Sequence, residues 1–226
     1  MNKLDLKDIT LVCIDDTSTR LAAEIMSRVS EVINFADMKL FSSINEKAVT
    51  NKISPINSLT DYSLFAVNEL HNYIESEFCM FIQADGYPLN LQAWTDEFLK
   101  YDYIGAPWTW VPTQKRLEFC PTGKCVGNGG FSIRSVKLMK EACNYDYDGT
   151  DGSGIKRDED EFICRVIDDK LKAKGIEFAP CELAHYFSIE NKIYSGQFGF
   201  HGPETLALNK KLGIFKFEEH AYEYMD

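Results

Sequence analysis

The chain has 226 residues, enough for one generous domain or at most two small ones. Hydrophobic residues make up 45% and charged residues 26%, the composition of an ordinary globular protein. Thirty-five acids against 24 bases give a net charge of −11, which argues against nonspecific binding to nucleic acid or anionic lipid. A nucleotide ligand is not excluded, because a divalent cation can bridge phosphates to carboxylates.

No segment approaches the roughly 18–20 apolar residues of a membrane span, and the N-terminal apolar run resembles a buried strand rather than a signal peptide. The seven cysteines are odd in number and several lie in apolar runs. We therefore expect reduced thiols and a cytoplasmic location. Cys120 and Cys125 could be two ligands of a zinc site, but no second Cys or His pair lies at a suitable spacing.

Strand-like and helix-like segments alternate along the first half of the chain. Continuously apolar, β-rich runs predict strands at residues 10–14, 33–41, 78–83 and 103–106. Helical spacing of apolar residues predicts helices at residues 17–33, 61–74 and 93–100. This alternation predicts an α/β fold with a mainly parallel central sheet flanked by helices.

The second half is less regular. It contains the segment VGNGGFSIRS, predicted helices at 135–143 and 162–173, and a Gly/Asp-rich loop at 144–154 between them. We see no internal repeat and no linker long enough to divide the chain, so residues 1–226 are expected to form a single domain.

Asp85 stands just past the end of the predicted central strand, where an α/β sheet places its ligands. It can be a metal-binding or catalytic carboxylate, or Asp85-Gly86 can be a simple turn. The glycines of residues 127–130 can likewise form a hairpin loop or allow close approach of a ligand. They match neither a P-loop nor a dinucleotide fingerprint.

Four consecutive acids, residues 158–161, precede the predicted helix at 162–173. Asp158 is well placed to cap that helix, and acids in a first turn suit the helix dipole. Crowded carboxylates can also have a raised pKa, and one facing a cleft can act as a general base. His201 lies in FGFHG, and a lone histidine of this kind is more often structural than a metal ligand.

Five segments occur together in one order: FIQADG, AWTDEFLKYDYIGAPW, VGNGGFSIRS, EDEFICR and FGFHG. This series resembles a family of small bacterial and viral glycosyltransferase-like proteins with a GT-A fold. VGNGGFSIRS followed by an acidic helix start is also similar to segments of β-1,4-galactosyltransferases. The resemblance covers roughly residues 65–202. It implies a Rossmann-like nucleotide-sugar-binding half (residues 1–106) and an acceptor and catalytic half (residues 107–226).

The resemblance implies a transferase that moves a sugar from a nucleoside-diphosphate sugar, with UDP favoured, to a glycan, lipid-linked sugar or glycoprotein. The DxD motif of that fold, which holds ribose and Mn²⁺ or Mg²⁺, matches Gln83-Ala84-Asp85. Glutamine replaces the first acid, so metal dependence can be weaker or absent. The resemblance implies Asp85 and His201 as metal ligands.

The resemblance also implies Asp160 as the base that deprotonates the acceptor in an inverting reaction, with Glu159 as the alternative. It places Ile14 and Asp15 near the nucleotide base. The donor sugar is expected against the segment from Asn128 through Gly129 to Gly130, with Trp108 and Phe131 offering apolar faces. The loops at 109–124 and 144–154 are expected to close over the donor.

Two other functions remain open. A non-catalytic member of the same fold would bind nucleotide sugar or glycan without transfer, as the missing first acid of DxD suggests. A nucleotidyltransferase would show a glycine- and lysine-rich segment soon after the first strand, and residues 15–30 contain none.

Overall fold

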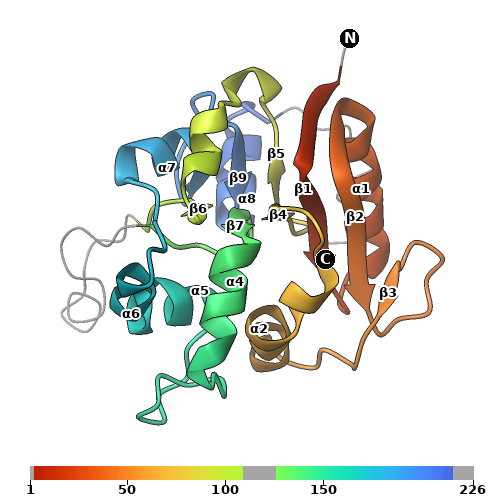
Figure 1. The fold of residues 1–226 in the computed structure, drawn as a ribbon. Helices are drawn as coiled ribbons and strands as arrows, with labels where there is room; N and C mark the ends of the chain where they lie inside the picture. The colour runs from red at the N-terminus through yellow and green to blue at the C-terminus, as the bar shows by residue number, and fades with distance from the viewer. Residues whose placement is uncertain (1–2, 109–125, 216–226) are drawn as a thin grey trace.

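The computed structural model describes residues 3–108 and 126–215. A six-stranded sheet forms the centre of the molecule, in the order β3-β2-β1-β4-β7-β6. In Figure 1, β1 and β2 stand between α1 on one side and α2 with α4 on the other. The expected α/β architecture with a helix-flanked central sheet is therefore confirmed.

The predicted strands and helices of the first half occur in the predicted order, together with two short strands, β3 and β5, that were not predicted. The strands are β1 (Leu4–Ile14), β2 (Ile33–Ser42), β3 (Asn51–Lys52), β4 (Phe78–Phe81), β5 (Gly86–Pro88) and β6 (Tyr103–Gly105). The helices are α1 (Thr19–Val32), α2 (Leu59–Asn68) and 3₁₀ turns at Leu70–Tyr73, Leu91–Ala93 and Asp96–Lys100. The single short helix expected at 93–100 is wrong, because an extended Trp94 separates two 3₁₀ turns there.

The second half adds β7 (Ser132–Ser135), β8 (Ser188–Glu190) and β9 (Gly199–His201). Its helices are α4 (Val136–Ala142), α5 (Glu159–Glu161), α6 (Asp168–Ala173), α7 (Cys181–Phe187) and α8 (Pro203–Lys211), with a 3₁₀ turn at Cys143–Tyr145. The continuous helix expected at 162–173 is wrong. A π-helical turn, Phe162–Val166, follows α5, and Ile167 separates it from α6.

The sheet is parallel from β3 through β4 and antiparallel around β7, which pairs with β4 on one side and β6 on the other. Because β6 is antiparallel to β7, it runs in the same direction as β4, so only β7 opposes the other five strands and a mainly parallel sheet is confirmed. Because β7 comes from the second half and lies between two strands of the first, the two halves of the chain share one sheet. Strands β5, β9 and β8 form a separate three-stranded sheet that sequence analysis did not predict.

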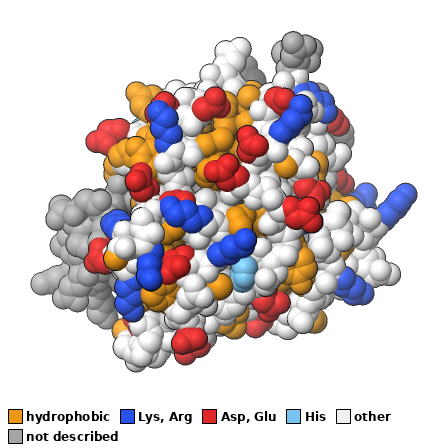
Figure 2. Space-filling model, viewed as in Figure 1, with side chains coloured by type: hydrophobic (Ala, Val, Ile, Leu, Met, Phe, Trp, Pro, Cys, Tyr) orange, Lys and Arg blue, Asp and Glu red, His pale blue; other side chains and the backbone are white. Residues whose placement is uncertain are grey.

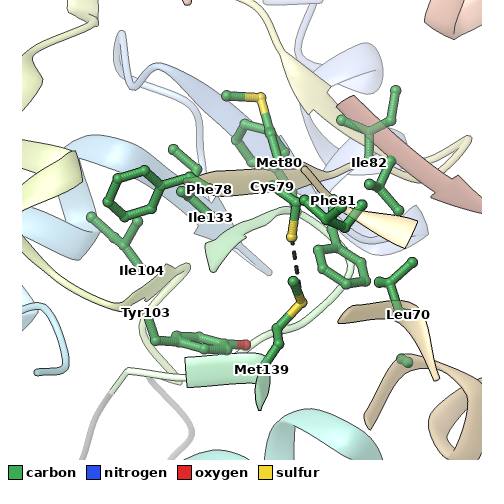
Figure 3. Packing of buried hydrophobic residues seen from close by; sticks show 14 of the residues in the cluster. Leu70, Phe78, Cys79, Met80, Phe81, Ile82, Tyr103, Ile104, Ile133 and Met139 are labelled. Carbon is green, nitrogen blue, oxygen red and sulfur yellow. Dashed lines mark hydrogen bonds between the residues drawn. The ribbon is translucent and has the colours of Figure 1, made fainter. Parts of the chain in front are cut away.

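The core lies where the central strands meet their covering helices. Strand β4 is buried along its whole length, and Cys79 makes a sulfur contact of 3.6 Å with Met139 of α4 (Figure 3). Charged side chains of both signs are interspersed over the face seen in Figure 2. Within the described residues, no helix is long and apolar enough to cross a membrane.

The cysteines are not all alike. Cys13, Cys79, Cys143 and Cys164 are free thiols, as expected. Cys181 is disulfide-bonded, so the expectation that every cysteine is reduced is wrong at this position. The possible zinc ligands Cys120 and Cys125 lie outside the described residues.

Asp16, just after β1, joins the ends of two strands to the following loop. Its carboxylate accepts hydrogen bonds from the Ser42 hydroxyl (2.5 Å), the Ser43 amide (2.7 Å) and hydroxyl (2.7 Å), and the Ile56 amide (2.8 Å). Burial opposes ionisation, but these hydrogen bonds outweigh it and lower the pKa of Asp16 to about 2.

We expect Asp16→Ala to lower the free energy of unfolding by about 2–3 kcal/mol at neutral pH, because four donors lose a charged acceptor. The folded-state pKa lies below the unfolded value of about 3.9. The stabilisation is therefore present above about pH 4 and is lost as the pH falls toward 2. Urea denaturation across this range measures it. Asp5→Ala, which removes an exposed ion pair with Lys7, is the control, and an equal loss in both variants would contradict the prediction.

Candidate functional site

The predicted functional segments meet at one edge of the central sheet. Asp15 follows β1, residues 83–85 follow β4, and Trp108 follows β6, all at the carboxyl ends of parallel-running strands. Residues 128–130 precede β7, and because β7 runs antiparallel to β4, its start lies at that same edge. Parallel α/β sheets bind ligands at this edge.

Two adjoining cavities lie there, and both are bounded by Leu59, Tyr62 and Gln83. The larger has a volume of about 460 Å³ and is lined by Ile14, Asp15, Asp16, Thr17, Ser18, Ile56, Asn57, Ser58, Ala84 and Asp85 as well. The smaller has a volume of about 240 Å³ and is also lined by Trp108, Asn128, Gly129, Gly130, Asp158, Glu159, Asp160, Glu161, Glu190 and His201. Together they form a cleft with acids along both parts.

His201, on the central strand of the small sheet, reaches back to the residues that follow β4. Its Nε2 lies 3.0 Å from Oε1 of Gln83 and 3.9 Å from Oδ1 of Asp85, and its Nδ1 lies 3.5 Å from Oε1 of Glu190. Burial disfavours the imidazolium, but Glu190 and then Asp85 outweigh it, so the pKa of His201 is raised.

Asp160 lies in the first turn of α5 and faces the smaller cavity. Its carboxylate accepts hydrogen bonds from the backbone amides of Gly129 (2.7 Å) and Glu161 (2.7 Å). Burial, followed by the negative charge of Glu159, raises the pKa of Asp160 to about 7 in spite of these hydrogen bonds. A carboxylate with such a pKa can accept a proton near neutral pH.

Glu159, the alternative base, is already engaged in other interactions. It forms an ion pair of 2.9 Å with Arg134 of β7, and both side chains are almost fully buried. The guanidinium also lies over the Phe81 ring, 3.9 Å from its centroid, and Ser63 exchanges hydrogen bonds with Glu159. This geometry favours a structural role for Glu159 and favours Asp160 as the proton acceptor.

At two positions of the predicted donor-binding turn, neighbouring side chains leave no room for any residue larger than glycine. A Cβ at Gly129 would lie 2.1 Å from Oε1 of Glu159, and a Cβ at Gly130 would lie 1.9 Å from Nε2 of His201. Asn128 between them and β6 has a positive φ of 57°, as a sharp turn requires. The glycines therefore bring β7 close to both α5 and the small sheet.

The acidic residues at the start of α5 do not cap the helix in the way that we expected. Asp158 stands at the N-cap position but its side chain caps no amide of the helix. Instead Asp160 accepts from the Glu161 amide. Asp15 stabilises the turn into α1, because its carboxylate accepts hydrogen bonds from the backbone amides of Thr17 and Ser18.

Of the two aromatic residues expected near the sugar, one lines the cleft and the other lies in the core. Trp108 lines the smaller cavity, with the guanidinium carbon of Arg165 4.2 Å from its ring centroid. Phe131 is fully buried and stacks on Phe187 at 4.8 Å, so its expected contact with sugar is wrong. The loop at 109–124 lies outside the described residues, and its expected closure stays a prediction.

Several residues of the cleft were not predicted, among them Glu190, Tyr62 and Leu59. Glu190 lies on β8, which the sequence did not reveal because the strand has only three residues. The helical pattern of α2 predicts Tyr62 as a core residue. Its hydroxyl nevertheless lies in the cleft, 3.4 Å from Nε2 of Gln83. Leu59 is exposed at the start of the same helix. Neither periodicity nor a motif could have marked these positions as part of a cleft.

Among the described residues, no group of three or more His, Cys, Asp or Glu side chains is arranged to hold a metal ion. Asp85 and His201 offer two ligand atoms, an oxygen and a nitrogen, and the Gln83 side-chain amide lies beside them. One or two protein carboxylates completed by substrate phosphates are usual for Mg²⁺. A metal at this position would therefore need a bound substrate to supply most of its ligands.

The fold and this cleft define an α/β protein with a carboxylate-rich site at the carboxyl edge of its parallel strands. The chain belongs to the family described as "protein of unknown function (DUF5672)", which matches residues 44–201. That span includes Asp85, Asp160, Glu190 and His201 but not β1 or Asp15. No curated protein matches the sequence.

We expect Arg134→Met to lower the free energy of unfolding by about 3–5 kcal/mol, because Glu159 would be left as an unpaired buried charge. Arg134→Met combined with Glu159→Leu should recover much of that loss. Denaturant titration measures both. Arg20→Met, which removes an exposed i,i+4 pair with Glu24, should change stability by about 0.5 kcal/mol or less. A loss no larger for Arg134→Met than for Arg20→Met would show that the buried pair is unimportant.

Proposed function

We propose that this protein is a glycosyltransferase of GT-A type that transfers a sugar from a nucleoside-diphosphate sugar to a hydroxyl group of a glycan acceptor. The observation that carries the proposal is the Asp160 carboxylate. Its raised pKa and its position in a cavity that adjoins a larger one suit a general base next to a donor site.

The charge of the cleft supports a metal-assisted donor site. Eight carboxylates line the two cavities, from Asp15, Asp16, Asp85, Asp158, Glu159, Asp160, Glu161 and Glu190, and no Lys or Arg is among the described lining residues. A diphosphate would be repelled by these acids unless a cation compensated them. A metal held by Asp85 and His201, with Gln83 beside them, would supply that positive charge to the diphosphate leaving group.

The positions of these groups support the following transfer step. The acceptor oxygen forms a bond to the anomeric carbon while the bond from that carbon to the diphosphate oxygen breaks, and its electron pair leaves with the nucleoside diphosphate. Asp160 takes the proton of the attacking hydroxyl. Its hydrogen bond from the Gly129 amide holds the carboxylate toward the cavity. A single displacement inverts the anomeric configuration.

The non-catalytic alternative has one observation in its favour. Gln83, at the first position of the expected DxD motif, brings no charge and hydrogen-bonds to His201. A protein that only binds nucleotide sugar would use the same cleft. Turnover separates the two functions.

We expect Asp160→Asn to lower the rate of transfer by about 10²–10⁴-fold while donor binding is retained, because only proton transfer is lost. In the wild type, the rate should rise with pH around 7, since Asp160 must be ionised to act as a base. Product formation followed by mass spectrometry measures both. Asp37→Asn, an exposed acid on β2, is the control. A full rate in Asp160→Asn, or no transfer by the wild type with any donor, would contradict the catalytic proposal.

We expect a nucleotide sugar at about 100 times its Kd to raise the melting temperature by about 5–10 °C, and more strongly with Mn²⁺ present. UDP sugars are the first donors to screen. Asp85→Asn and His201→Gln should each remove the additional effect of Mn²⁺, whereas Asp37→Asn should keep it. A shift that is equal with and without Mn²⁺ would contradict the metal-assisted donor site.

A further inference from the structure

The imidazole of His201 is held between two glycines. A Cβ at Gly86 would lie 2.6 Å from its Cδ2, and a Cβ at Gly130 would lie 1.9 Å from its Nε2. Gly86 and His201 are also register partners in the small sheet. The ring therefore fits closely between two backbone segments, and its two nitrogens face different partners.

Each nitrogen meets a defined polar group. Nε2 faces the side-chain amide of Gln83 at 3.0 Å, with Asp85 at 3.9 Å. Nδ1 is buried, and its acceptor is Glu190 Oε1 at 3.5 Å, since no closer partner exists among residues 3–108 and 126–215. Strands β8 and β9 pair Glu190 directly with His201, so the carboxylate is placed by the backbone.

The possible proton positions are limited by these partners. A neutral imidazole with its proton on Nε2 would turn the Nδ1 lone pair toward the Glu190 carboxylate, which is repulsive. With the proton on Nδ1, Glu190 accepts it. Turning the Gln83 amide by 180°, from the orientation with Oε1 toward His201 and Nε2 toward Tyr62, lets its NH₂ group donate to Nε2 of His201 while its oxygen accepts from the Tyr62 hydroxyl. Side-chain amide orientation is assigned from such networks. Of the two neutral tautomers, only the Nδ1–H form satisfies every group.

We propose that Glu190 is a positioning residue that accepts the Nδ1 proton of His201 and thereby directs the Nε2 lone pair toward Gln83 and Asp85. A carboxylate behind a ligating histidine fixes the tautomer in this way. The value of that lone pair for metal binding rests on the proposed function. The tautomer itself does not, because it is a property of the protein without substrate.

The test is a long-range ¹H–¹⁵N NMR correlation of the full-length, ¹⁵N-histidine-labelled protein at alkaline pH, where the imidazole is neutral. His201→Gln identifies the signals of His201 among the four histidines. The wild type is expected to show the proton on Nδ1, the opposite of the tautomer favoured by free histidine. A proton on Nε2 in the wild type would overturn the proposal without any variant at Glu190.

Two variants test the role of Glu190 itself. Glu190→Gln keeps an oxygen that can accept from Nδ1 and is expected to retain the Nδ1–H form. Glu190→Ala is expected to shift His201 toward Nε2–H, since only Gln83 then remains as acceptor. Glu204→Ala, an exposed acid on α8, controls for general effects. An unchanged tautomer in Glu190→Ala would overturn the proposal, and neither result depends on whether sugar transfer is found.

Discussion

The buried ion pair between Arg134 and Glu159 is the interaction on which the site depends, because it joins β7 of the central sheet to the start of α5. Arg134 also donates to the carbonyl of Gly129 at 3.3 Å, while the amide of the same glycine donates to Asp160. One guanidinium thus organises both neighbours of the proposed base. Burying the two charges costs desolvation energy on folding. Leaving one of them buried without its partner costs more, so conformations that separate Arg134 from Glu159 are strongly disfavoured.

The same ion pair also affects the pKa of Asp160. Glu159 is held one residue away by Arg134, and its charge, together with burial, raises the pKa of Asp160. The second group of the cleft, His201, is placed by a different device, the close packing of its ring against Gly86 and Gly130. Glycines in this protein therefore act at the site mainly by allowing side chains from distant elements to approach.

Sequence patterns predicted several elements well. Helical spacing located α1, and the apolar run at 78–83 located β4, because both bury side chains with a regular period. The pattern failed at 162–173, where a π-helical turn interrupts the helix beside Arg165 and Trp108 without altering the apolar spacing. It also missed β8 and β9, since three-residue strands have too few residues to show a period.

The sequence by itself determined the order of strands and helices in the first half and pointed to Asp85, Asp160 and His201 as polar residues in unusual contexts. Only the tertiary structure decided that Glu159, and not Asp160, pairs with Arg134, that Phe131 belongs to the core, and that Glu190 lies beside Nδ1 of His201. Those distinctions depend on contacts between residues far apart in the chain. Local patterns carry no information about such contacts, because they arise only when β7 enters the sheet and the small sheet closes against it.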